Sequence, residues 1–177
     1  MNRNTRRQTG FTLVEVLIPV AVAAVLLGSA LPSLQTMTQR HRLEGSAAQL
    51  ETDLQLARSA AVAANAVLRM DFVRGEQGSC YVLHDGAAGD CTCGHLGVPA
   101  CPAGVTALRS VALRDADPLR LNANVRSMAF DPVKGTVTPT ASIRLVAPVG
   151  ELRLVVNVMG RVRSCTPDAA VPGYRPC

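Results

Sequence analysis

The feature that most constrains this chain is an apolar segment near its N-terminus. From Phe11 to Leu31 the segment is interrupted by only three polar side chains, those of Thr12, Glu15 and Ser29. Its 21 residues, at about 1.5 Å each in a helix, span about 31 Å, which matches the roughly 30 Å hydrocarbon layer of a bilayer. Three basic residues precede it, Arg3, Arg6 and Arg7. The positive-inside rule then predicts a cytoplasmic leader and export of everything after Leu31.

Glu15 distinguishes between the possible kinds of export segment. A carboxylate in an apolar span costs up to about 3 kcal/mol on insertion scales. Neither a signal peptide cleaved at the small residues 28–30 nor a plain membrane anchor explains this cost. The position of Glu15, four residues after Phe11, places it on the helix face where it can neutralise an α-amino group at Phe11, its own or that of a neighbouring subunit.

The sequence from Gly10 to Glu15 resembles the class III leader site of type IV pilins and type II secretion pseudopilins. The resemblance implies that a prepilin peptidase cuts between Gly10 and Phe11 and that Phe11 is then methylated. It also implies that Glu15 pairs with the amine of a neighbouring subunit during filament assembly.

Beyond Pro32 the sequence predicts a second helical stretch and then strands. One apolar face steps by four and three residues through Leu43, Ala47, Leu50, Leu54, Ala57, Ala61 and Ala64. After Asn65 the period changes to two, which predicts strands at Leu68–Phe72, Tyr81–His84, Val105–Leu113, Leu119–Val125, Ile143–Ala147 and Leu152–Val158. The expected fold is α+β, with a long N-terminal helix, first transmembrane and then amphipathic, packed on an antiparallel β-sheet head.

These patterns divide the chain into four expected regions. They are a leader peptide over 1–10, a transmembrane and assembly helix over 11–32, an amphipathic helix over 33–66, and a β-rich head over 67–177 whose C-terminal tail is tethered by a disulfide.

Several further motifs resemble the FimT/GspH group of minor pilins and pseudopilins. They are Ala57-Arg58-Ser59, Asn65 at the helix end, Phe130 followed by Pro132 and Gly135, and Gly160-Arg161-Val162-Arg163. Together with the leader site they cover nearly the whole chain, so the resemblance implies the type IV pilin fold and a role as a minor pilin. The Cys-rich segment 80–101 departs from the pattern of the group.

The six cysteines predict disulfides, because an even number of cysteines in an exported head favours them. Cys165 and Cys177 bracket a Pro-rich tail with few apolar residues, so we expect this pair to hold the tail. Three pairings remain open for Cys80, Cys91, Cys93 and Cys101. A zinc site made by Cys91, Cys93, His95 and Cys101 is the alternative, but its spacing is unusual and an oxidising compartment competes for the thiols.

No enzyme is expected from this sequence, and neither is a cofactor or a small-molecule substrate. The chain carries no nucleophile elbow, phosphate loop or paired-carboxylate motif. Its three histidines lie in unrelated contexts, and we interpret them as surface or loop residues. Aromatic residues make up only 3% of the chain and Trp is absent, which argues against a site built from stacked rings.

The best remaining candidate for a binding site is basic and lies near the C-terminus. Gly160 is expected to turn the chain after a strand, and Arg161 and Arg163 then point to the same face of an extended segment. Two neighbouring guanidinium groups suit adjacent phosphates. Four further residues could extend the patch if they share its face: Arg175, Lys134, Arg144 and Arg153.

In the FimT group the Gly-Arg-x-Arg segment is associated with binding DNA during natural transformation. The resemblance therefore implies a minor type IV pilin that binds double-stranded DNA without sequence preference. The alternative is a structural minor pilin or pseudopilin, in which the arginines only keep an edge strand soluble. Both interpretations place the protein in the inner membrane, with a cytoplasmic N-terminus, and then in an extracellular pilus or periplasmic pseudopilus among other pilins.

Overall fold

The 52-residue helix α1 (Leu13–Ala64) is the longest element in the computed structural model of the protein. The structure describes residues 12–75, 78–94, 98–114, 119–168 and 171–177. The chain divides into two compact units, Met1–Met37 and Thr38–Cys177, and α1 contributes to both. The predicted cleavage and methylation site, Gly10 and Phe11, lies outside the described residues.

In the first unit, Thr12 and Glu15 cap the start of α1. The backbone N–H and the hydroxyl of Thr12 both donate to the Glu15 carboxylate at 3.0 Å, and the backbone N–H of Glu15 donates to Thr12 Oγ1 at 3.3 Å. This reciprocal arrangement is a capping box, which satisfies donors that the first turn of a helix leaves open. Glu15 therefore has a local structural role beside the predicted one in assembly.

Among the described residues, none of the helical segments combines the length and the apolar composition that a membrane span requires. The predicted span 11–32 begins with Phe11, which is not described, and the side chains of residues 27–33 are not described either.

In the second unit, α1 buries the face that the sequence predicts. Leu43, Ala47, Leu50, Leu54, Ala57 and Ala61 are each at most 2% exposed. Ala64 was expected on the same face but is exposed, because α1 ends there. The backbone N–H groups of Asn65 and Ala66 donate to the carbonyls of Val62 and Ala61, and Asn65 adopts a φ of 49°. This is a Schellman end, in which Asn tolerates the left-handed conformation better than most residues.

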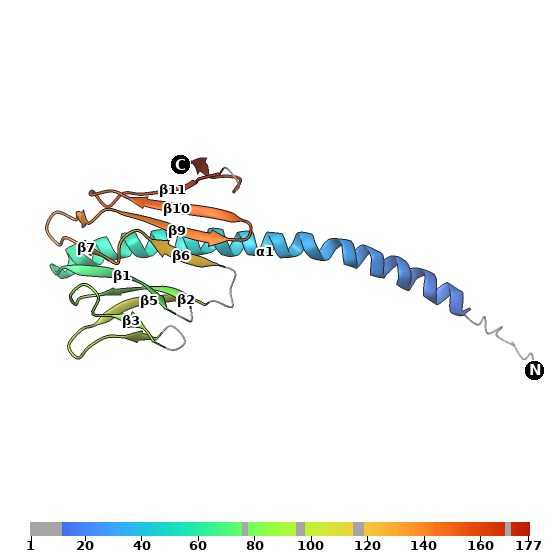
Figure 1. Ribbon diagram of the computed structural model, residues 1–177, viewed down its shortest axis with the longest axis horizontal. Helices are drawn as coiled ribbons and strands as arrows, with labels where there is room; N and C mark the ends of the chain where they lie inside the picture. Colours follow the sequence, from blue (N-terminus) through green and yellow to red (C-terminus); the bar gives the residue numbers. More distant parts are fainter. Residues whose placement is uncertain (1–11, 76–77, 95–97, 115–118, 169–170) are drawn as a thin grey trace, which may run out of the picture. The chain divides into compact units, whose positions relative to one another are not determined.

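The described strands form two large sheets and a small hairpin (Figure 1). The first sheet has the order β5-β2-β1-β7-β8, and all of its pairs are antiparallel. Its strands are β1 (Leu68–Gly75), β2 (Gly78–His84), β5 (Ala107–Arg114), β7 (Ser127–Phe130) and β8 (Val137–Thr138).

The second sheet has the order β12-β11-β10-β9-β6. Its strands are β6 (Arg120–Ala123), β9 (Ala141–Ala147), β10 (Gly150–Val156), β11 (Val162–Thr166) and β12 (Arg175–Pro176). Only the short β11–β12 pair among these described strands is parallel. The predicted strand Leu152–Val158 is two residues too long at its end, since β10 stops at Val156 and Val158 is exposed.

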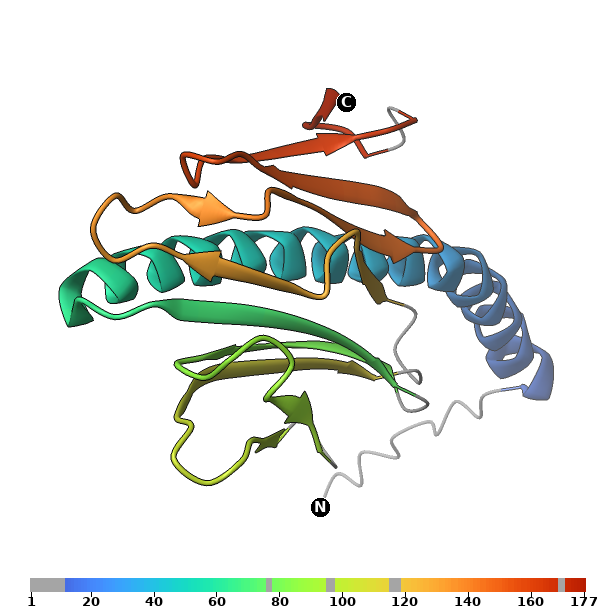
Figure 2. The ribbon, with the colours of Figure 1, turned by 60° about the vertical axis from the view of Figure 1, so that its left-hand side comes forward.

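Both sheets pack on the same length of α1, as Figure 2 shows. The inner face of the first sheet contributes Met70, Leu83, Met128 and Phe130, and that of the second contributes Ile143, Leu145, Leu152 and Leu154, all buried in one cluster with the helix. The predicted α+β fold, with an N-terminal helix packed on antiparallel sheet, is confirmed. The division into two sheets was not predicted.

Polar contacts also connect the helix to each sheet. The Tyr81 hydroxyl on β2 donates to Asp53 on α1 at 2.6 Å, and Arg109 on β5 lies 3.3 Å from the same carboxylate. Burial, and then the hydrogen bond to Asp53, raise the pKa of Tyr81 far above its usual value. On the other side, Ser164 on β11 donates to Glu51 at 3.2 Å. The hydrogen bond from Tyr81 is buried and that from Ser164 is partly buried, and together they connect α1 to both sheets.

The Cys-rich segment covers the outer face of the first sheet. Cys80–Cys93 joins β2 to β3 (Thr92–Cys93), which pairs with β4 (Pro99–Ala100), and Cys91–Cys101 closes the same segment. A third disulfide, Cys165–Cys177, holds the C-terminal tail. These bonds resolve the connectivity that the sequence leaves open. They also remove the thiolates that the zinc alternative needed, while His95 lies outside the described residues.

Candidate functional site

An open groove of about 740 Å³ lies between the last turns of α1 and the start of β11. The helix contributes one ridge of side chains, Gln55, Arg58, Ser59, Val62 and Ala63. The strand side contributes the turn and first residues of β11, Gly160, Arg161, Val162 and Arg163. The groove therefore brings together two motifs that are far apart in the sequence, Ala57-Arg58-Ser59 and Gly160-Arg161-Val162-Arg163.

A tight turn positions Arg161 at the edge of this groove. The backbone N–H of Arg161 donates to the side chain of Asn157 at 2.9 Å, and the N–H of Gly160 donates to the Asn157 carbonyl at 2.9 Å. Gly160 has a φ of 71°, a conformation that side chains with a Cβ rarely adopt. The turn after β10 therefore depends on a glycine at this position, as the sequence predicts.

Alternation along β11 separates the two arginines from the core. Val162 lies opposite the buried Val156, whereas Arg163 lies opposite the exposed Val155 on the outer face of the sheet. Arg161 and Arg163 are both exposed. Within the described residues neither side chain has an ion pair or a hydrogen-bond acceptor, so both guanidinium groups are available to an anion.

Arg58 completes the cationic side of the groove. Its side chain lies between two glycines, since a Cβ built on Gly160 would lie 3.1 Å from Arg58 Cδ and one built on Gly135 would lie 3.1 Å from Arg58 Nε. Gly135 also has a positive φ, of 60°. The turn Asp131–Gly135, the turn at Gly160 and the helix thus meet at one arginine. The sequence does not predict Arg58 as a site residue, although Arg58 belongs to the motif Ala57-Arg58-Ser59.

The predicted extensions of the patch lie in different places. Arg144 and Arg153 lie side by side on the outer face of the second sheet, next to the row of Arg163. Both are engaged by Glu151. Arg144 makes two hydrogen bonds of 2.9 Å to its carboxylate, and Arg153 makes one of 3.1 Å. Burial alone would raise the pKa of Glu151, but these hydrogen bonds outweigh it and lower the pKa below its usual value.

Arg175 and Lys134 both lie outside the groove, in β12 and in the turn that ends at Gly135. Arg175 lies beside Cys165 in the β11–β12 register, where the disulfide to Cys177 holds the tail. Lys134 is exposed in the turn that ends at Gly135, and its backbone N–H donates to Asp131 at 2.7 Å. The groove therefore brings Arg58 together with Arg161, and neither of these two predicted residues lines it.

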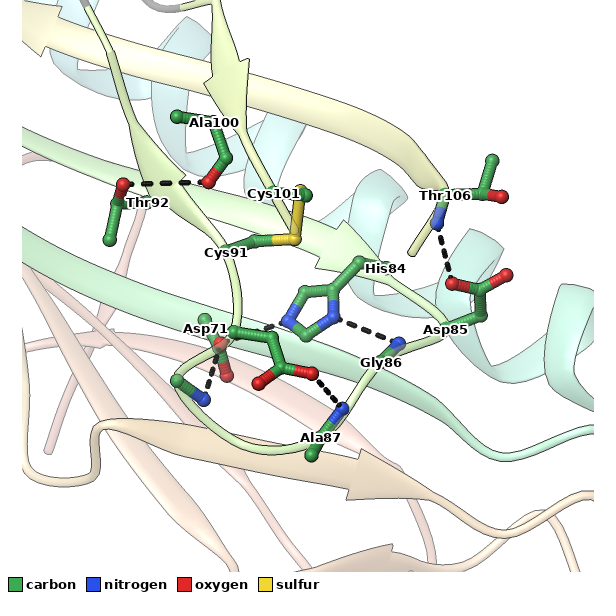
Figure 3. A network of polar contacts seen from close by, with 12 residues as sticks. Asp71, His84, Asp85, Gly86, Ala87, Cys91, Thr92, Ala100, Cys101 and Thr106 are labelled. Atoms are coloured by element: carbon green, nitrogen blue, oxygen red, sulfur yellow. Dashed lines mark hydrogen bonds and ion pairs between the residues drawn. A yellow bond between two sulfur atoms is a disulfide. The ribbon is translucent and has the colours of Figure 1, made fainter. Parts of the chain in front are cut away.

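A second polar cluster lies under the Cys-rich segment (Figure 3). His84 Nε2 lies 2.8 Å from Asp71 Oδ2, and His84 Nδ1 accepts the N–H of Gly86 at 3.1 Å. The Asp71 carboxylate also accepts the N–H of Gly89 at 2.8 Å. Both side chains are buried, so the interpretation of His84 as a surface or loop residue is wrong. The pair fixes the covering segment to β1 and β2.

The arrangement of one N-terminal helix on antiparallel sheets defines the type IV pilin class of folds. The type IV minor pilin FimU of Pseudomonas aeruginosa has this fold, with 20% identity, a TM-score of 0.53, and coverage of 72% of this chain and 90% of that one. The minor pseudopilin EpsH of Vibrio cholerae is similar with a TM-score of 0.48 and 12% identity, covering 71% of this chain and 97% of its own.

The sequence itself identifies the family. Residues 46–160 match the family described as type II transport protein GspH, and residues 5–31 match the prokaryotic N-terminal methylation motif. The chain therefore belongs to the GspH family, the FimT/GspH type of minor pilins and pseudopilins. The comparison with curated proteins gives no match.

Proposed function

We propose that this protein is a minor type IV pilin whose head binds DNA through the groove beside β11, for DNA uptake in natural transformation. A prepilin peptidase removes residues 1–10, the new N-terminal Phe11 is methylated, and the helix assembles with those of other pilins. Before assembly the protein lies in the inner membrane with its N-terminus in the cytoplasm. The methylation motif at residues 5–31 supports this maturation.

The observation that carries the DNA proposal is the state of Arg161 and Arg163. Both are exposed at the groove, and neither has an ion-pair partner within the described residues. Arg144 and Arg153, by contrast, already share Glu151. Free guanidinium groups bind phosphates by charge-assisted, often bidentate hydrogen bonds. Such contacts recognise the backbone and not the bases, so we expect binding without sequence preference and with strong salt dependence.

The test replaces Arg161 and Arg163 together by Gln in the full chain, purified in detergent under oxidising conditions. Binding of a short duplex of mixed sequence, measured by fluorescence anisotropy across a salt series, should be lost in the double variant at low salt. The affinity of the parent should decline steeply with salt. In a plot of log binding constant against log salt concentration, each phosphate contact should add about 0.9 to the steepness of the slope.

The matched control replaces Arg74 and Arg126 by Gln. Both arginines are exposed and lie outside the groove, so this variant loses the same charge. It should bind nearly as well as the parent. Equal losses in both double variants would show a diffuse charge effect, and unchanged binding in the Arg161 and Arg163 variant would contradict the DNA proposal.

A purely structural role is the second candidate, in a type IV pilus or a type II secretion pseudopilus. One observation favours it. β12 pairs only with Cys165 and Thr166, so the edge of β11 beside Val162 and Arg163 carries no described strand. Charged residues on an open edge prevent pairing with other chains. If the parent binds no DNA even at low salt, this role is the better account.

A further inference from the structure

We propose that Arg58 is a third phosphate-binding residue, and that it forms with Arg161 and Arg163 a preformed seat for the DNA backbone. This inference rests on the DNA binding proposed above and deepens it. The seat joins the helix to the C-terminal motif, so a phosphate bound there contacts two elements of the head.

The first observation is that Arg58 has no acidic partner within the described residues, although it is partly buried. Several other arginines of the head have one. Arg40 lies 2.8 Å from Glu44, Arg109 lies 3.3 Å from Asp53, and Arg144 lies 2.9 Å from Glu151. A partly desolvated cation without a counter-charge interacts more strongly with an incoming anion than a fully hydrated one does. Arg58 therefore shares with Arg161 and Arg163 a guanidinium group that no described carboxylate neutralises.

The second observation is that the protein holds this side chain in place. Gly135 and Gly160 lie against the guanidinium group and the Cδ of Arg58, and any Cβ at either position would meet it at 3.1 Å. Because the side chain is already confined, binding loses less conformational entropy than it would for a free surface arginine. The two glycines thus prepare Arg58 to bind an anion.

The third observation is the composition of the groove around Arg58. Gln55 and Ser59 lie on the same ridge of α1, and Arg161 and Arg163 lie across from it. None of these groove residues is acidic. The amide of Gln55 and the three guanidinium groups are donors that suit phosphate oxygens. A carboxylate from a neighbouring subunit could also bind arginine, but two exposed arginines beside a third favour a polyanion with repeated charges.

The experiment measures how the salt dependence of DNA binding changes in Arg58→Gln. Binding of the same duplex to the full chain in detergent should weaken, and the log–log slope should fall by about 0.9, the loss of one phosphate contact. Arg58→Lys keeps the charge and should keep the slope while binding more weakly, because it loses the planar fork. Arg126→Gln is the charge-matched control and should change neither quantity.

The slope of the salt dependence also distinguishes a lost phosphate contact from a loss of folded protein. A variant that is only partly folded binds less in proportion at every salt concentration, so its slope stays that of the parent. An unchanged slope in Arg58→Gln, with binding lost in the Arg161 and Arg163 double variant, would overturn the seat while leaving the DNA proposal intact. Absence of binding by the parent would instead overturn the DNA proposal itself.

A second measurement needs no variant. The parent protein is modified with an arginine-selective dicarbonyl, with and without DNA, and the modified sites are found by peptide mass spectrometry. DNA should protect Arg58 together with Arg161 and Arg163, and should leave Arg74 and Arg126 reactive. Equal modification of Arg58 with and without DNA would contradict the proposal.

Discussion

At the scale of single residues, the contact between Gly160 and Arg58 explains why a glycine begins the Gly-Arg-x-Arg segment. Gly160 needs a φ of 71°, and its missing Cβ leaves the space that Arg58 Cδ and Val137 Cγ2 occupy, at 3.1 and 3.4 Å from where a Cβ would lie. Backbone conformation and packing therefore both require glycine at this position. The same two requirements hold at Gly135 on the other side of Arg58.

We predict that Gly160→Ala destabilises the head more than Gly104→Ala does. The left-handed conformation alone costs a residue with a Cβ about 1–2 kcal/mol. Gly104 has a similar φ of 89° but open space around it, so only this cost applies there. In Gly160→Ala the Cβ must also displace Arg58. Urea unfolding of both variants measures the free energy of unfolding. If both variants lose the same free energy, the contact between the new Cβ and Arg58 does not destabilise the head.

At the scale of elements, the sequence predicts well what depends on local periodicity. The apolar stripe of α1 is buried from Leu43 to Ala61, because a helix presents every third or fourth residue to one side. The strand around Met70 follows its alternating pattern on the inner face. Asp71 on the opposite face is the exception, since the Cys-rich segment covers it and buries it as well.

The elements that the sequence misses depend on distant partners. β8 and β12 have two residues each, too few for a period to show. Of β2 the sequence predicts only Tyr81–His84, because the strand is buried on both faces and its residues do not alternate between apolar and polar. The division into two sheets follows from which strands pair, for example β1 with β7, and local patterns carry no such information.

The candidate site shows the same limit. The spacing of Arg161 and Arg163 could be interpreted from the sequence, because two residues apart on an extended segment share a face. Arg58 could not be placed with them, because its contact with Gly160 arises only when the helix packs on the end of β10. The sequence also could not show whether Arg144 and Arg153 are free to bind a phosphate. Each donates to Glu151, and that contact arises only when β9 and β10 pair.

At the scale of the whole molecule, Glu15 has two possible contributions to assembly that a single variant separates. It closes the capping box with Thr12 in this structure, and it is proposed to neutralise the amine of a neighbouring subunit. Glutamine can replace glutamate in a capping box but carries no charge. We therefore predict that Glu15→Gln keeps the helix start but impairs incorporation into filaments as strongly as Glu15→Ala.

Quantifying each variant in sheared filaments and in membranes tests this prediction. Both variants should accumulate in the membrane while their share in filaments falls. If Glu15→Gln enters filaments as the parent does and Glu15→Ala does not, the cap and not the charge is what assembly requires.

The proposed role in a pilus depends on the chain being a processed filament subunit. The most direct measurement is the mass of the N-terminal peptide from protein recovered from filaments. We predict a chain that begins at Phe11 and carries one N-methyl group. A chain that begins at Met1, or at a residue after the apolar segment, would contradict it.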